Sequence, residues 1–348
     1  MKNDYSKILV TGGAGWLGKG LLKALESGIP ECEALTTPLI DAKIKVLVLP
    51  HEKNEIVKHF PAIEIVEGDL TNKDDCEAFF AGESDAILFH LAGIIHPKSK
   101  VKEFYDVNVD GSRTLLTEAE RVGVKRVVVM SSNSPIGCNP NNTHQFDESS
   151  PYNPYMNYGE SKRQLELLVH EFQNKGKLET VIIRAPWFYG PFQPDRQLEF
   201  FEMIKNGKGP IVGDGNNMRS MAYVDNLAQG LILAATTEAA SGETYWIADE
   251  QPYSMNQILN TIERLLKDDF GQNCKYGRLK LPSFASDVAW VIDKVIQSIG
   301  LYHQKFHVLS EMNKNIACSV DKAKIELGYK PTISLEEGMR RSLAEFYS

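Results

Sequence analysis

Tyr158 and Lys162 are the residues in this sequence whose types and spacing could carry acid–base chemistry. They lie four positions apart at the start of a stretch that predicts a helix to about Gln173, so they share one helix face. A free tyrosine has a pKa of about 10 and is a poor base at neutral pH, but a nearby ammonium group lowers that pKa. The pair could therefore transfer a proton, or it could be an ordinary surface pair on a helix.

Hydroxyl side chains precede this helix, where an apolar run at 126–130 predicts a strand. Ser131, Ser132, Asn133 and Ser134 follow that run directly. A serine at a strand end could hold the oxygen atom on which an acid–base pair acts. Ser132 and Ser131 are therefore the candidates for that task.

A glycine turn near the start of the chain is the element that could bind a ligand in front of these residues. The segment Thr11-Gly12-Gly13-Ala14-Gly15-Trp16-Leu17-Gly18 lies between a predicted strand at 7–10 and a predicted helix at 19–26, which is the context of a dinucleotide-binding fingerprint. Gly12 would allow the tight turn, Gly15 the approach of a pyrophosphate, and Gly18 close packing of the helix. The helix N-terminus would attract the phosphates. The alternative is a plain glycine turn.

Predicted strands and helices alternate along the first half of the chain. This order predicts an α/β fold, a Rossmann-type doubly wound parallel sheet with ligands at the carboxyl ends of its strands. We expect a nucleotide-binding domain over 1–185 and a smaller carboxyl-terminal substrate lobe over 186–348, with 219–247 returning to the sheet. The further strands are predicted at 44–49, 63–70 and 85–93, and further helices at 74–80 and 103–122.

The end of the second predicted strand bears on the choice of cofactor. A carboxylate there would bind the ribose 2′-hydroxyl of NAD, and a cation would accept the 2′-phosphate of NADP. The strand is followed by Pro50-His51-Glu52-Lys53, with no acid in first place. His51 or Lys53 thus favours NADP slightly over NAD.

Composition excludes several classes of protein. The 348 residues carry a net charge of −8, so we expect no nucleic-acid partner. The five cysteines are scattered without a Cys-x-x-Cys pair, so neither a metal site nor a disulfide framework is expected. The sequence shows no apolar signal region and no apolar run long enough to span a bilayer, and we expect a cytoplasmic protein.

Together these motifs resemble the extended short-chain dehydrogenase/reductases of the NAD-dependent epimerase/dehydratase superfamily. The resemblance covers nearly the whole chain. Besides the glycine turn, the serine pair and Tyr158-x-x-x-Lys162, its motifs are Gly68-Asp69-Leu70, His90-Leu91-Ala92, Asn108-Val109-x-Gly111 and Arg184-Ala185-Pro186-Trp187-Phe188-Tyr189-Gly190-Pro191.

The resemblance implies a role for each matching residue. Tyr158 would be the acid/base, Lys162 would hold the nicotinamide ribose and lower the tyrosine pKa, and Ser132, with Ser131 as runner-up, would position the substrate oxygen. Substrate would also meet Asn133. The implied contacts of NAD(P) are Thr11, Gly12, Gly15, Trp16, Leu17, Gly18, His51, Asp69, Leu70, Leu91, Ala92, Gly93, Asn108, Lys162, Pro186 and Phe188. The family also implies a homodimer built from the helices at 104–122 and 158–173.

The carboxyl lobe carries two features that suggest different substrates. Arg219 matches the position where nucleotide-sugar enzymes bind a diphosphate, although it could instead pair with Asp225. The stretch 279–300 resembles the 3β-hydroxysteroid dehydrogenase branch, in which such a helix faces lipid-like substrates or a membrane. This implies a possible peripheral membrane contact through 286–300. The alternative is an amphipathic helix packed on the core through Val288, Ala289, Ile292, Val295, Ile296 and Ile299.

The sequence and the resemblance thus predict an NAD(P)-dependent oxidoreductase acting on a secondary alcohol or ketone of a small-molecule substrate. The preferred substrate is 3β-hydroxysteroid-like, and the alternative is a nucleotide-sugar 4-epimerase or ketoreductase. A 4,6-dehydratase is disfavoured, because Asn133 and Ser134 stand where that family has an acid pair. A redox-sensing regulatory protein that binds NAD(P) is the alternative of another class.

Overall fold

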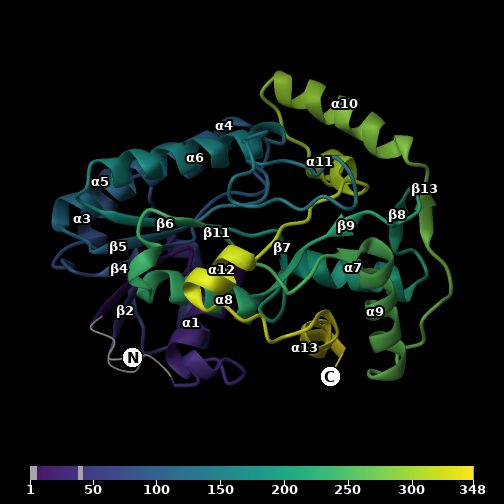
Figure 1. Cartoon of the computed structure of the whole chain (residues 1–348), viewed down its shortest axis with the longest axis horizontal. Coiled ribbons are helices and arrows are strands. Elements are labelled where there is room, and N and C mark those ends of the chain that lie inside the picture. The colour runs from purple at the N-terminus through teal and green to yellow at the C-terminus, as the bar shows by residue number, and fades with distance from the viewer. Residues whose placement is uncertain (1–5, 38–41, 348) are drawn as a thin grey trace.

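A parallel sheet of seven strands organises the computed structural model of the chain, which describes residues 6–37 and 42–347 (Figure 1). All neighbouring strands in it are parallel, which confirms the predicted Rossmann-type fold. The strand order is β11-β6-β5-β4-β1-β2-β3. The bounds are β1 Lys7–Thr11, β2 Lys43–Val48, β3 Glu64–Glu67, β4 Ile87–His90, β5 Arg126–Met130, β6 Glu179–Arg184 and β11 Thr244–Trp246.

Helices cover both faces of this sheet, so its central strands are apolar on both sides. In β1, Ile8 and Val10 pack with α1 (Trp16–Ser27) and α8 (Val224–Thr236). Leu9 points to the other face, toward α3 (Lys73–Phe79), α5 (Ser112–Val122) and α6 (Met156–Asn174). These two groups of helices lie below and above the sheet in Figure 1.

The strand order reverses at β1: β2 and β3 follow on one side of it, and β4, β5 and β6 follow on the other. Connections leave the carboxyl ends of these strands toward opposite faces, and such a switch point leaves a crevice for a ligand. The glycine turn follows β1, and Leu91-Ala92-Gly93 follows β4. Both predicted cofactor segments therefore border one crevice.

The helix predicted at 103–122 is not a single α-helix. It consists of α4 (Lys102–Tyr105), a π-helical turn η3 (Asp106–Gly111) and α5. A π turn inserts an extra residue into the helix and is frequent at functional sites. Here it contains Asn108, a predicted site residue.

The remaining elements form the carboxyl lobe at the right of Figure 1. Its core cluster joins β10 (Met221–Tyr223), α9 (Met255–Asp268) and α13 (Leu335–Tyr347). The other elements of the lobe are β7 Trp187–Tyr189, α7 Asp195–Lys205, β8 Pro210–Val212, β9 Met218–Arg219, β12 Tyr253–Ser254, β13 Leu279–Leu281, α10 Phe284–Ser298 and α11 Gln304–Glu311. Two short helices complete the fold, α2 Lys53–His59 and α12 Asp321–Leu327.

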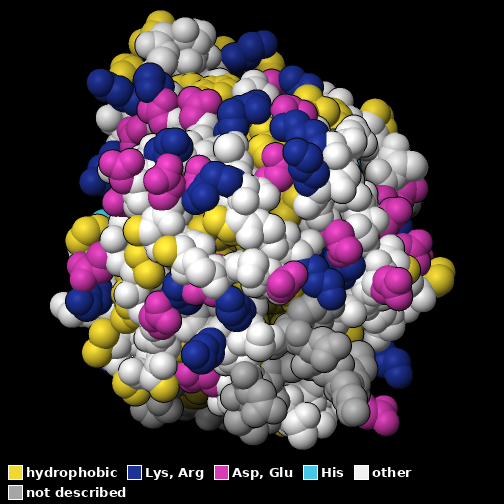
Figure 2. All heavy atoms as spheres, turned by 90° about the vertical axis from the view of Figure 1, so that its left-hand side faces the viewer, with side chains coloured by type: hydrophobic (Ala, Val, Ile, Leu, Met, Phe, Trp, Pro, Cys, Tyr) yellow, Lys and Arg dark blue, Asp and Glu magenta, His cyan; other side chains and the backbone are white. Residues whose placement is uncertain are grey.

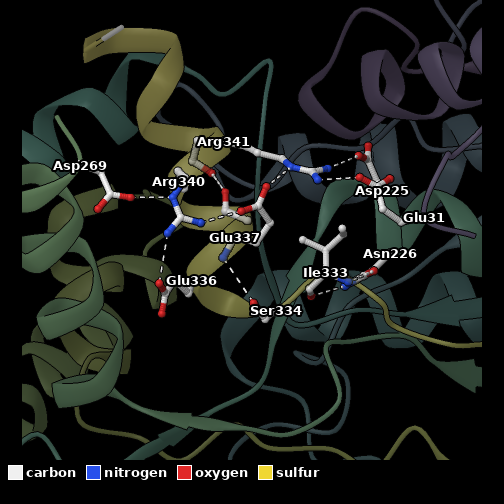
Figure 3. A network of polar contacts seen from close by, with 12 residues as sticks. Glu31, Asp225, Asn226, Asp269, Ile333, Ser334, Glu336, Glu337, Arg340 and Arg341 are labelled. Carbon is white, nitrogen blue, oxygen red and sulfur yellow. Dashed lines mark hydrogen bonds and ion pairs between the residues drawn. The ribbon is translucent and has the colours of Figure 1, made fainter.

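Ion pairs join α13 to both parts of the molecule (Figure 3). Arg340 donates to Asp269 just after α9 at 2.6 Å. Arg341 donates to Glu31, after α1, at 2.6 Å, and lies 3.9 Å from Asp225 in α8. Arg219 donates instead to the Glu311 carbonyl, and within residues 6–37 and 42–347 the cation paired with Asp225 is Arg341.

The face of the molecule at the left of Figure 1, where α3 and α5 lie, carries charges of both signs. Figure 2 shows Lys and Arg side chains interspersed with Asp and Glu across this face. A basic stripe that would follow a phosphate backbone is not visible there.

Candidate active site

The geometry of the glycine turn fits a dinucleotide pyrophosphate. Gly12 has φ +72°, which favours glycine, and a Cβ there would lie only 2.7 Å from the Ala92 nitrogen. No residue with a side chain fits at this position. A Cβ on Gly18 would overlap the Gly12 carbonyl oxygen. Gly15 is different, because its Cβ would approach only the Gly12 oxygen, at 3.2 Å. Gly15 is also the N-cap of α1 and brings no capping side chain, which leaves the helix amides for an anion.

The side chain of Trp16 has a structural task that the sequence did not indicate. Its indole N–H donates to the carbonyl oxygens of Gly190 at 3.1 Å and Pro191 at 2.8 Å. The ring meets Phe188 edge-on with centroids 4.9 Å apart. Trp16 therefore connects the glycine turn to β7, and Phe188 faces that turn. Leu17 is buried in the core instead of facing a ligand.

A buried chain of hydrogen bonds fixes the ends of β1 and β4. The Thr11 hydroxyl lies 2.8 Å from Nδ1 of His90, and Nε2 of His90 lies 2.8 Å from the Ser112 hydroxyl. Burial lowers the pKa of His90 to about 3, so this imidazole is neutral. Thr11 also accepts from the Ala92 N–H at 3.4 Å, which positions the segment Leu91-Ala92.

Asn108 and Lys162 meet at the loop that follows β4. The Asn108 amide accepts from the Ile94 N–H at 2.8 Å and donates to the Ile94 carbonyl at 3.0 Å. A Cβ on Gly93 would lie 3.1 Å from Asn108 Oδ1 and 3.2 Å from Lys162 Nζ. Gly93 therefore leaves room for both side chains, and Lys162 Nζ donates to the Met130 carbonyl at 3.0 Å.

Tyr158 is buried beside Lys162, and its ionisation differs from the expected direction. Burial raises the pKa of Tyr158 to about 12, while a hydrogen bond with Ser132 opposes this increase. We expected the Lys162 ammonium to lower this pKa, but that ammonium donates to Met130 instead. Tyr158 is therefore protonated at neutral pH.

The two candidate serines have different surroundings. The Ser131 hydroxyl donates to the buried carboxylate of Glu166 at 2.5 Å. The Ser132 hydroxyl has longer contacts: it donates to the Ser134 hydroxyl at 3.3 Å and to Asn133 Oδ1 at 3.5 Å, and it accepts from the Ser134 N–H at 3.3 Å. It also lowers the pKa of Tyr158. This arrangement favours Ser132, the first choice from the sequence, because Ser131 is already engaged.

The predicted adenosine end lies where β2 and β3 finish. Lys53 forms an ion pair with Glu67 at 2.6 Å, whereas His51 is exposed. The Asp69 carboxylate accepts from the backbone and hydroxyl of Thr71 at 2.9 and 2.8 Å, so it shapes its own turn. Leu70 follows in that turn, and its carbonyl oxygen accepts a hydrogen bond from the Cys76 thiol.

Arg219 lies in β9 with its side chain in the lobe interior. Its Nη2 donates to the Glu311 carbonyl at 2.8 Å, while Nε is buried without a partner. The Glu311 carboxylate acts to raise the pKa values of both Arg219 and Tyr158.

The predicted site residues Pro186 and Asn133 lie near the end of β6. Pro186 lies between β6 and β7, and the Asn133 N–H donates to the Ala185 carbonyl at 3.2 Å.

The structure adds aromatic residues that sequence reasoning missed. Tyr302 and Phe104 share a buried cluster with Tyr158, with Ile94 packed against it. The Tyr302 hydroxyl lies 2.6 Å from Nδ1 of His96. No local motif marks Tyr302, which reaches the site only through the folding of the carboxyl lobe.

Family comparison agrees with this geometry. Residues 8–248 match the model of the NAD dependent epimerase/dehydratase family, and the chain belongs to this family. It is accordingly an NAD-binding enzyme of the extended short-chain dehydrogenase type. Among residues 6–37 and 42–347, no cluster of potential metal ligands occurs, and no helix there is long and apolar enough to cross a membrane.

Three relatives match along nearly their whole length. Uncharacterized protein y4nL of Sinorhizobium fredii is 48% identical, covering 97% of this chain and 94% of the relative. N-acetyl-alpha-D-glucosaminyl-diphospho-ditrans,octacis-undecaprenol 4-epimerase of Escherichia coli O157:H7 is 31% identical, covering 97% and 94%. The decarboxylating sterol-4-alpha-carboxylate 3-dehydrogenase of Candida albicans is 30% identical, covering 99% and 98%.

Solved structures share the fold. A dTDP-glucose 4,6-dehydratase from Streptomyces venezuelae, solved with NAD bound, has a TM-score of 0.73 at 24% identity and covers 97% of this chain and 96% of its own. Relatives of this chain thus include steroid dehydrogenases, an epimerase and, in fold, a dehydratase.

Proposed function

We propose that this chain is an NAD(P)-dependent oxidoreductase that acts on a secondary alcohol or ketone of a lipid-like ring substrate, best represented by a 3β-hydroxysteroid. The observation that carries the proposal is the buried Tyr158, with Lys162 one turn further along α6 and with Ser132, which lowers the Tyr158 pKa. When bound, NAD supplies or accepts the hydride. Ser132 would hold the substrate oxygen, and Tyr158 would exchange a proton with that oxygen.

The surroundings of Tyr158 support an apolar substrate. Phe104 packs on its ring, and Tyr302 belongs to the same buried cluster, so the phenol lies in apolar surroundings. The Glu311 carboxylate near Arg219 and Tyr158 would oppose an anionic group. The similarity to a sterol dehydrogenase points in the same direction.

A lipid-linked sugar is the second candidate substrate, favoured by Arg219. Its unpaired, buried Nε could donate to a diphosphate. The epimerase relative acts on a sugar joined through a diphosphate to undecaprenol, which combines a charged group with an apolar chain. In this case the chain would oxidise and re-reduce one hydroxyl without net change in the cofactor.

Binding and turnover measurements separate the two substrates. The cofactor-loaded protein would be incubated with a sterol alcohol or with UDP, alongside Arg219→Ala, while nicotinamide absorbance is followed. We expect a sterol alcohol to bind and to change the absorbance, and Arg219→Ala to leave this unaffected. Micromolar binding of UDP that disappears in Arg219→Ala would contradict the sterol proposal and support the epimerase.

The choice between NAD and NADP stays a prediction. Because Lys53 is bound to Glu67, His51 is the remaining predicted cation for a 2′-phosphate. We keep the slight preference for NADP on this residue alone. Calorimetry with both dinucleotides on the wild type and on His51→Ala tests it, since equal affinities in both proteins would remove the preference.

The exposed face of α10 supports peripheral contact with an anionic bilayer. Five apolar side chains of this helix and its end are between 51% and 68% exposed. These are Phe284, Val288, Val291, Val295 and Ile299. The buried side is mainly polar, since Asp293 accepts from His307 at 2.8 Å and Gln297 accepts from the backbone of Asn157 at 3.1 Å. The alternative of packing on the core holds in part, because Ala289 is buried and Ile292 and Ile296 are half-buried, whereas Val288, Val295 and Ile299 are exposed.

Lysines adjoin this apolar face. Lys100 forms a backbone bridge with Leu301, just beyond α10. Lys98 and Lys102 on either side of it are exposed, and Lys102 pairs with Asp106. Lys294 lies on the helix itself, over the Trp290 ring. In a protein of net charge −8, this local group of cations complements an anionic headgroup layer.

Vesicle sedimentation tests the membrane contact. We expect the protein to sediment with phosphatidylglycerol vesicles and far less with phosphatidylcholine vesicles. Val291→Glu/Val295→Glu should abolish sedimentation because it places charges in the apolar face. Val57→Glu, on the exposed part of α2, is the control and should sediment normally; equal binding by all three proteins would contradict the proposal.

A further inference from the structure

Glu166 is a buried carboxylate one helical turn beyond Lys162 in α6, with no assigned role. Its side chain is 0% exposed. It accepts from the Ser131 hydroxyl at 2.5 Å and the Tyr152 hydroxyl at 2.9 Å. Arg184 donates to it from Nε at 3.1 Å and Nη2 at 2.6 Å. The carboxylate thus joins the ends of β5 and β6 to the helix that carries Tyr158.

A charge in this place has to be compensated, because burying an unpaired carboxylate is costly. Arg184 provides that compensation, and its own guanidinium lies over the rings of Tyr152 and Trp246. Breaking such a pair on one side typically leaves an uncompensated buried charge. Arg184 therefore keeps the Glu166 carboxylate ionised between the strand ends and α6.

Lys162 and Glu166 lie four positions apart on α6, so their side chains share one face of this helix. Burial lowers the pKa of Lys162 to about 8, and the Glu166 carboxylate opposes that decrease. The other titratable groups facing Lys162 are Tyr158 on its own helix and His90 at the end of β4, both neutral near pH 7. The charged group on β6 is Arg184, which is hydrogen-bonded to Glu166.

We propose that Glu166 is a positioning residue: held by Arg184, it keeps the Ser131 hydroxyl out of the reaction and keeps Lys162 charged beside the cofactor and Tyr158. This inference rests on the proposed function, in which Lys162 holds the nicotinamide ribose. Glu166 itself touches neither substrate nor cofactor. Its effect therefore passes through Lys162 and Ser131.

The affinity of NAD as a function of pH tests this role without a substrate. Calorimetry on the whole chain between pH 6 and 10 should show wild-type affinity falling as Lys162 loses its proton. In Glu166→Gln the midpoint of that fall should move down by about one pH unit, equivalent to a tenfold weaker hold on the Lys162 proton. Ser131→Ala removes a neutral partner of Glu166 and should leave the midpoint in place.

A second variant covers the possibility that Glu166→Gln does not fold. Glu166→Leu/Arg184→Met removes both buried charges, a replacement that folded proteins often tolerate. Its midpoint should also move down. A wild-type midpoint in the folded variants, or an equal shift in Ser131→Ala, would overturn the role of Glu166. Neither result would affect the role of Tyr158, which is measured by turnover in Tyr158→Phe.

Discussion

At the scale of single residues, the proposed chemistry depends on the protonation of Tyr158. Burial holds its pKa near 12, so the phenol carries its proton at neutral pH and can donate it to a ketone. Oxidation of an alcohol needs the phenolate instead. With rising pH, the rate of ketone reduction should therefore fall and the rate of alcohol oxidation should rise.

We predict that alcohol oxidation increases from pH 7 toward pH 10, as the Tyr158 phenolate forms. Ser132→Ala removes the hydrogen bond that lowers the Tyr158 pKa, so the increase should shift to higher pH. The initial rate of oxidation, measured across pH in both proteins, checks this. A profile that stays in place in Ser132→Ala would show that Ser132 does not contact the reacting phenol.

At the scale of elements, the proposed cofactor site depends on the turn between β1 and α1. We predict that Gly15→Val weakens NAD binding severely, because a side chain there would point into the space of the pyrophosphate. The φ of Gly15, −71°, is accessible to valine, so thermal unfolding should change little. Calorimetry showing wild-type affinity would reject the fingerprint assignment.

Sequence reasoning predicted the sheet well because its strands are buried on both faces. The central residues of β1 and β5, Ile8 to Val10 and Val127 to Met130, are apolar, and a predicted helix follows each strand. The glycine turn could be predicted because the spacing of its glycines follows from the backbone conformation that the turn requires. The π turn around Asn108 was not, since an extra residue in a helix leaves no mark in apolar periodicity.

The orientation of α10 could not be derived from periodicity. A pattern gives the angular position of apolar side chains on a helix, not the side on which the protein lies. Here the buried side carries Asp293 and Gln297, whose partners His307 and Asn157 come from other elements. Tyr302 and Glu166 were missed for the same reason, because their roles depend on contacts between distant segments.

At the scale of the whole molecule, the carboxyl lobe completes the site from outside the sheet. Trp16 joins the glycine turn to Gly190 and Pro191, and Arg341 joins α13 to Glu31 (Figure 3). Contacts of this kind fix the lobe relative to the nucleotide-binding sheet. The residues of the proposed substrate site, Ser132 and Arg219, accordingly come from both halves of the chain.

We predict a homodimer formed by the helices α4–α5 and α6, as the family resemblance implies. Leu167 on α6 is 43% exposed and would become buried in such a pairing. Light scattering at micromolar concentration should give twice the chain mass, and Leu167→Glu should reduce it. A monomer mass for the wild-type protein would contradict the prediction.

The most direct test of the proposed reaction follows one hydrogen atom. A sterol alcohol carrying deuterium on its carbinol carbon is incubated with NAD or NADP and the protein, and the nicotinamide is analysed by mass spectrometry. We predict deuterium in the nicotinamide for the wild type and none for Tyr158→Phe, which should still bind the cofactor because only its proton donor is lost. Product formed without deuterium in the nicotinamide, or turnover by Tyr158→Phe within tenfold of wild type, would contradict hydride transfer at this site.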